Sequence, residues 1–129
     1  MATDKSKGKY VDGFVLVVPK KNVVAYKKMA RIGEKMWKKY GALDYKECMG
    51  DDLSPNMGGV SGLTFQKMTK VGKDEIVWFS YITYKSRAHR DQVNKKVMAE
   101  MAELERKHKS KMPFDLKQMA FGGFKVVVG

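Results

Sequence analysis

The residues of this sequence that could take part in chemistry lie around position 89. His89 stands between Arg87 and Arg90, shortly after Ser86, which is a good N-cap for a helix. Cationic neighbours and a helix N-terminus disfavour the charged form of an imidazole. A neutral histidine beside two arginines could orient an anionic ligand, or His89 could simply be a surface histidine at the start of a basic helix.

The single cysteine, Cys48, is a weak candidate nucleophile. Glu47 precedes it and Asp51 and Asp52 follow it, and acidic neighbours disfavour the reactive thiolate. We therefore interpret Cys48 as an ordinary half-buried residue. One cysteine cannot form an intrachain disulfide, which fits a reducing compartment, and we expect a cytoplasmic protein.

The other patterns that could bind ligands are incomplete. His89 and His108 lie 19 residues apart without a pair of cysteines, so we expect no zinc site. Asp51 and Asp52 lack a third carboxylate at a defined spacing for a divalent cation. The stretch "SPNMGGVSG" lacks the lysine and the strand-to-helix context of a phosphate-binding loop. We therefore expect no metal and no cofactor.

The length and composition indicate one globular domain. The chain has 129 residues, of which 43% are hydrophobic and 31% are charged. Its longest apolar runs, such as "FVLVV", are far shorter than the roughly 20 residues that span a bilayer, so we expect no membrane segment. We interpret residues 1–8 as a short flexible N-terminus and residues 9–129 as a single domain.

The net charge of +12 raises nucleic acid or another polyanion as a partner. Between positions 20 and 39 there are eight Lys or Arg residues against one Glu, but this stretch is a predicted helix whose solvent face lysines would fill. The aromatic signature of an RNA-binding sheet is absent, and "FGGFKVVV" resembles it only superficially. Nucleic acid is therefore possible but not favoured.

The first half of the chain alternates strand and helix patterns. Residues 9–18 read as a strand that Pro19 ends. Apolar residues then recur at steps of three and four, which predicts an amphipathic helix over 22–40, followed by a glycine cap at Gly41. A second strand is predicted over 42–49, and a glycine-rich loop follows it.

The second half repeats the order. A strand is predicted over 75–84 and a helix from Ser86 to about Glu105, while residues 63–75 fit either a short strand or one helical turn. A last strand covers "KQMAFGGFKVVV", where Gly122 and Gly123 indicate a bulge or a close backbone approach. The order βαββαβ predicts an α+β ferredoxin-like fold, a four-stranded antiparallel sheet with two helices on one face.

The predicted sheet is apolar on both faces, although two helices can cover only one. In the strand "VWFSYITY", Trp78 and Ser80 would share one face, and Phe79 and Tyr81 the other, and the sequence does not decide which face meets the helices. Packing of two sheets in a homodimer is the simplest cover for the second face. The candidate interface residues are Phe79, Tyr81, Phe121 and Phe124.

Four ordered motifs resemble those of a known family: "KYVDGFVLVVPK", "GALDYKECMGDD", "FSYITYKSRAHRDQVNKKVMA" and "MPFDLKQMAFGGF". The chain is similar over about residues 9–127 to the YbaA-like family of uncharacterised bacterial proteins. The resemblance implies a subunit of the dimeric α/β-barrel type, whose two sheets face each other across a two-fold axis, and it implies no established activity. The wider group includes cofactor-independent monooxygenases and haem-degrading enzymes, but their catalytic residues do not map onto this chain.

Two classes of function remain open. The first is small-molecule binding, or a cofactor-independent monooxygenase-like activity, in a pocket between sheet and helices that takes a small aromatic or anionic ligand. Its candidate lining residues are Trp37, Tyr45, Trp78 and Ser80, with His89 and Arg90 at the rim. The second is a non-enzymatic basic module that binds RNA or another polyanion, or a purely structural dimer. Whether the protein is an enzyme stays undecided.

Overall fold

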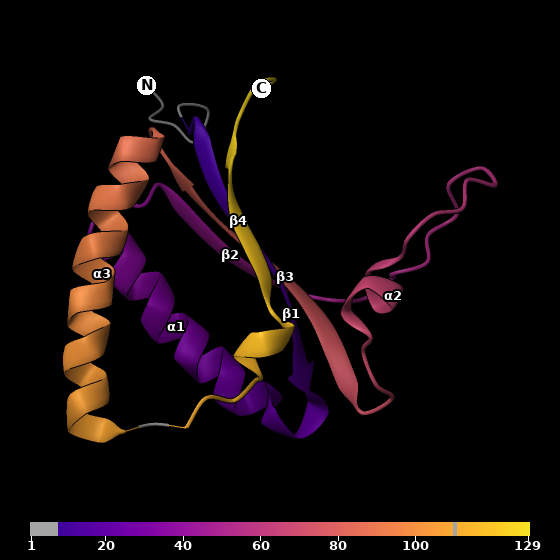
Figure 1. The fold of residues 1–129 in the computed structure, drawn as a ribbon, viewed down its shortest axis with the longest axis horizontal. Coiled ribbons are helices and arrows are strands. Elements are labelled where there is room, and N and C mark those ends of the chain that lie inside the picture. The colour runs from indigo at the N-terminus through magenta and orange to yellow at the C-terminus, as the bar shows by residue number, and fades with distance from the viewer. Residues whose placement is uncertain (1–7, 110) are drawn as a thin grey trace.

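The computed structural model describes residues 8–109 and 111–129, so nearly all of the expected N-terminal segment lies outside the described residues. Its four strands form one antiparallel sheet in the order β2-β3-β1-β4. Figure 1 shows the two long helices side by side on one face of the sheet. This is the α+β ferredoxin-like fold expected from the sequence. The elements are β1 (Tyr10–Pro19), a 3₁₀ turn (Lys20–Asn22), α1 (Val23–Lys39), β2 (Asp44–Met49), α2 (Phe65–Thr69), β3 (Glu75–Tyr84), α3 (Arg87–His108), a second 3₁₀ turn (Leu116–Gln118) and β4 (Ala120–Lys125).

The starts of α2 and α3 follow local capping chemistry. The Ser86 hydroxyl oxygen accepts a hydrogen bond from the His89 backbone N–H at 3.0 Å, which confirms the predicted cap of α3. The helix runs to His108, three residues beyond the predicted end, and stops at Lys109, whose φ is 47°. The ambiguous stretch forms the single helical turn α2, capped by the Thr64 side chain.

The structure decides which face of β3 meets the helices. Trp78, Ser80 and Ile82 point toward them and are buried, whereas Phe79 lies on the opposite face and is 44% exposed. Two apolar clusters fill the space under the helices, and their members come from all three of β1, β2 and β3, from α1 and α3, and from Ala42 between α1 and β2. The most deeply buried members are Leu16, Val18, Tyr84, Val93 and Val97.

The two glycines of β4 permit a close approach and form no bulge. The register with β1 runs without an extra residue from Lys125 opposite Tyr10 to Ala120 opposite Val15. A Cβ on Gly123 would lie only 2.8 Å from Cε2 of Tyr10, so this position has no room for a side chain.

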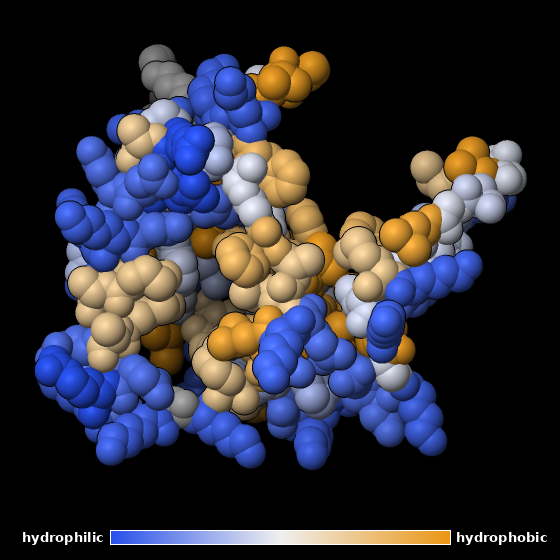
Figure 2. All heavy atoms as spheres, in the orientation of Figure 1, coloured by the Kyte–Doolittle hydropathy of each residue, from blue (hydrophilic) through white to orange (hydrophobic). Residues whose placement is uncertain are grey.

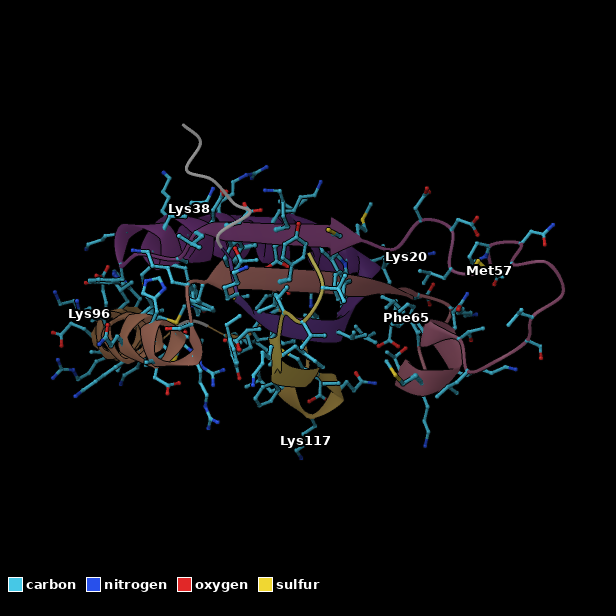
Figure 3. All side chains as sticks on the ribbon, turned by 90° about the horizontal axis from the view of Figure 1, so that it is seen from above. Lys20, Lys38, Met57, Phe65, Lys96 and Lys117 are labelled. Carbon is cyan, nitrogen blue, oxygen red and sulfur yellow. The ribbon has the colours of Figure 1, made fainter. Side chains whose placement is uncertain are left out.

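The segment 50–64 leaves the sheet as an extended arm and returns through α2, which contacts β1 and β3. Figure 1 shows α2 on the face opposite α1 and α3, and Figure 3 shows Met57 far out on the arm, with Phe65 at the base of α2. Beneath α2, Val17 and Val77 pair across the two strands and are buried. The rest of this face has no cover within the described part of the chain.

Candidate functional site

A glutamate held by two tyrosine hydroxyls lies between the sheet and α1. Glu47 is on β2, and alternation along the strand turns its side chain toward the helices. Its Oε1 accepts a hydrogen bond from the hydroxyl of Tyr26 on α1 at 2.7 Å, and its Oε2 accepts one from the hydroxyl of Tyr45 at 2.8 Å. We call these three residues the Glu47 cluster.

Burial shifts the proton affinities of the Glu47 cluster. It raises the pKa of the Glu47 carboxyl, while the hydrogen bonds from the two tyrosines oppose that shift. Burial also raises the pKa of Tyr26 and of Tyr45, and the nearby Glu47 charge adds to both shifts. Both hydroxyls therefore remain protonated donors, and the carboxyl is the group of the cluster that exchanges a proton most readily.

Aromatic and polar side chains surround the Glu47 cluster. The ring of Trp78 lies 4.8 Å from that of Tyr26, and the buried Nε1 of Trp78 has no hydrogen-bond partner among the described residues. Ser80 is buried and directly opposite Glu47 in the β2–β3 register. The cluster and its surroundings thus combine an acid, hydrogen-bond donors and closely packed aromatic rings.

Trp37 lies between the Glu47 cluster and a second set of hydrogen-bonded side chains, those of Asn94 and Tyr84. Its ring is 5.9 Å from that of Tyr45, and its Nε1 donates to Oδ1 of Asn94 at 3.0 Å. The same Asn94 oxygen accepts a hydrogen bond from the Tyr84 hydroxyl at 3.1 Å. Trp37 is therefore anchored to α3 by its indole N–H.

Arg90 forms ion pairs with two carboxylates near the start of α3. Its Nη1 lies 2.5 Å from Oδ1 of the buried Asp12, its Nε lies 2.8 Å from Oδ1 of Asp91, and its guanidinium is 5.1 Å from the ring centre of Tyr10. Burial raises the pKa of the Asp12 carboxyl, and the charge of Arg90 opposes that shift. Its two carboxylate partners occupy the guanidinium, which leaves little of it for an incoming anion.

The imidazole of His89 is neutral, because its Nδ1 accepts a hydrogen bond. Its Nδ1 accepts a hydrogen bond from the Lys85 backbone N–H at 3.0 Å. Burial lowers the pKa of the imidazole, and the charge of Lys85 adds to the shift. The lowering of the His89 pKa agrees with the expectation from the sequence that the charged form is disfavoured. Its main cause is burial and not the flanking arginines.

The structure brings together only part of the expected pocket lining. Tyr45, Trp78 and Ser80 lie at the Glu47 cluster, whereas His89 and Arg90 are in the separate network at the start of α3. Sequence reasoning missed Glu47, although alternation along β2 places it on the same face as Tyr45, two residues away. That alternation was the one signal that could have identified it.

The expectation for Cys48 was wrong, because its side chain is exposed. It lies on the uncovered face of β2, which is an edge strand. Phe79, Tyr81 and Phe124 share that uncovered face across neighbouring strands. Phe121 lies on the other face, where its ring stacks with that of Phe14 at 6.4 Å.

A hollow beside the arm and another near the start of α3 lie at the surface of the described residues, and none of the expected pocket residues lines either of them. One lies beside the arm and measures about 180 Å³, and the other, near the start of α3, measures about 510 Å³. Within residues 8–109 and 111–129, no group of three metal-ligating side chains comes together. No helix in these ranges is long and apolar enough to cross a membrane.

Comparison with known proteins gives relatives over most of the chain. Residues 9–116 match the family model DUF1428, described as a protein of unknown function. The uncharacterised protein YbaA of Escherichia coli strain K12 is 38% identical over 120 residues, which cover 93% of this chain and 97% of YbaA, and YbaA of Shigella flexneri gives the same values. A solved structure, a dimeric ferredoxin-like protein from an uncultured marine organism, aligns with 17% identity and a TM-score of 0.49 over 94% of this chain and 98% of its own.

Proposed function

We propose that this chain, which belongs to the DUF1428 family of proteins of unknown function, is a homodimeric protein that binds a small planar aromatic molecule at the Glu47 cluster. The Glu47 carboxyl is largely buried, which is unfavourable for its charged form, but it accepts hydrogen bonds from two hydroxyl groups. A titratable group with a shifted pKa beside unpaired polar atoms is typical of functional sites. The proposal rests on this single arrangement.

The chemistry of the cluster selects the class of ligand. Aromatic rings from Tyr26 and Trp78 favour a planar ring, and the unpartnered Trp78 Nε1 favours a carbonyl or hydroxyl oxygen on it. A negative charge on the ligand is disfavoured beside Glu47, so the aromatic alternative is preferred here to an anionic one. A carboxyl of raised pKa can also take a proton from a phenolic hydroxyl, the kind of step that a cofactor-independent monooxygenase-like reaction needs.

Ligand-dependent thermal unfolding tests the proposal. Purified protein is melted with a panel of uncharged phenols and quinones. A binder present at about 100 times its Kd adds about 2.7 kcal/mol of stability, which corresponds to a rise of about 8 °C or more in Tm. We expect the shift to disappear in Glu47→Gln and to persist in Glu103→Gln, the same substitution at an exposed position of α3. A panel without any shift, or an equal shift in both variants, refutes the ligand proposal.

The uncovered sheet face supports the homodimer. Phe79 is 44% exposed and Phe124 is 62% exposed. For side chains of roughly 150–250 Å², these fractions leave about 160–260 Å² in water, or about 4–6 kcal/mol per protomer. Both protomers together would gain about twice that, which is comparable with the cost of association of about 4–15 kcal/mol. Val15 and Tyr81, half-buried on the same face, add to the gain.

A pair of phenylalanine variants tests the dimer. Phe79→Asp places a charge in the centre of the proposed interface, whereas Phe121→Asp places it on the other face of the sheet. We expect light scattering to give a dimer for the wild type and for Phe121→Asp, and a monomer for Phe79→Asp. A monomeric wild type, or a dimer lost equally in both variants, contradicts the interface.

The distribution of charge argues against a nucleic-acid-binding module. Lys38, Lys96 and Lys117 point away from the sheet in three different directions in Figure 3, instead of lining one continuous face. If the protein is a dimer but binds no aromatic molecule of the panel, the purely structural alternative remains. RNA binding at about 50 mM salt that weakens steeply on adding salt would favour the basic module instead.

A further inference from the structure

The hollow of about 510 Å³ lies at the end of the molecule where β1 begins, β4 ends and α3 begins. Strand pairing assembles it from distant parts of the sequence, because Tyr10 pairs with both Tyr84 and Lys125. The Lys9 backbone N–H donates to the Tyr84 carbonyl at 2.9 Å, which fixes the rim. Its cationic lining residues are Lys9, Lys85, Arg87 and Lys125.

Among the residues that the structure describes, the four cations have no carboxylate partner. None of them forms an ion pair with another residue in the described ranges. One helical turn further along α3, in contrast, the charge of Arg90 is balanced by Asp12 and Asp91. Four like charges around one concave surface repel each other, and a bound anion would offset that repulsion. Figure 2 shows hydrophilic side chains at this end of the molecule, as well as along its other edges.

Neutral groups of the lining complement the charges. The Ser86 side chain accepts the capping hydrogen bond from His89, and its O–H remains a donor. The first turn of α3, a helix of 22 residues, brings backbone N–H groups and the positive end of the helix dipole. Gly123 contributes no side chain, so the Tyr10 ring packs over it and the hollow stays open.

We propose that this hollow binds a small phosphate-bearing molecule with at least two negative charges. Four cations together with neutral donors match the several acceptor oxygens of a phosphate group better than the two of a carboxylate. The volume lies in the range of small-molecule pockets, about 300–1,000 Å³. The site shares no residue with the Glu47 cluster, so it is independent of the aromatic ligand proposed above.

Calorimetric titration of the full-length protein with inorganic pyrophosphate, and separately with inorganic phosphate, tests this site. Arg87 and Lys125 would each form a charge-assisted hydrogen bond with the anion, so we expect Arg87→Ala and Lys125→Ala each to weaken pyrophosphate binding by about tenfold or more. Lys96→Ala, a charge removed from the exposed surface of α3, should leave the affinity unchanged. Thermal melts of all three variants verify that they are folded.

Three results would overturn the assignment. The first is that neither anion binds at millimolar concentration. The second is that Lys96→Ala weakens pyrophosphate binding as much as Arg87→Ala. The third is that a single-stranded RNA binds while pyrophosphate does not, with an affinity that Lys96→Ala and Arg87→Ala lower equally. This third result would indicate a diffuse polyanion surface instead of a built site.

Discussion

Replacing Arg90 by methionine tests whether this arginine stabilises the fold or is available to bind a ligand. Asp12 is 5% exposed, and its Oδ1 lies 2.5 Å from Nη1 of Arg90, whose side chain is 19% exposed. Removal of one member of a buried pair typically costs about 3–5 kcal/mol, because the remaining charge stays buried without compensation. A small domain has only about 5–15 kcal/mol of stability. We therefore expect Arg90→Met to lower Tm by roughly 10–20 °C.

A second substitution separates the ion pair from simple loss of packing. Asp12→Asn removes the stranded charge, so the double variant Asp12→Asn with Arg90→Met should recover a large part of the lost stability. Arg106→Met is the matched control, because that arginine is exposed and its ion pair is with Glu103 on the same helix. Chemical denaturation of the four variants and the wild type measures these effects. If Arg90→Met melts within about 2 °C of the wild type, or if Asp12→Asn recovers nothing, the structural role of Arg90 is refuted.

Three further predictions concern pH and packing. Burial raises the pKa of Glu47 above its ordinary value of 4.5, so stability should fall as pH rises from there through the raised value, and denaturant melts of Glu47→Gln should lack this slope. His89 has the opposite sign: burial lowers its pKa below 6.5, so stability should fall as pH drops through the window below 6.5, and His89→Gln should remove that fall in the same melts. Gly123→Ala forces a Cβ to within 2.8 Å of the Tyr10 ring and should cost about 1–3 kcal/mol, whereas Gly122→Ala, whose nearest contact is at 4.0 Å, should cost little by thermal melting.

Local signals in the sequence account for the elements and their order. The step of three and four predicted α1, the hydroxyl of Ser86 predicted the start of α3, and the strand over 75–84 has the predicted bounds. Each of these depends on residues a few positions apart. The end of α3 was placed too early, because a charged run such as "ERKHKSK" does not by itself interrupt a helix.

The candidate site was only partly predictable, because it depends on contacts between distant segments. Tyr26 and Glu47 are 21 residues apart, and Arg90 and Asp12 are 78 residues apart. Before the strand order is known, no spacing rule brings such pairs together. The sequence could therefore nominate Arg90 as a free cation, but it could not show that Asp12 neutralises its charge.

The contrast between Arg87 and Arg90 shows how the fold assigns different roles to like residues. They are three positions apart on α3, so both side chains lie near the same end of the sheet. Asp12 holds Arg90 over the ring of Tyr10, and the ion pair with the buried Asp12 fixes the half-buried guanidinium. Arg87 has no such partner in the described residues and lines the hollow, as Tyr10 does. An arginine of this motif is thus available to an anion only where the sheet places no carboxylate beside it. The number of arginines in the motif does not decide this.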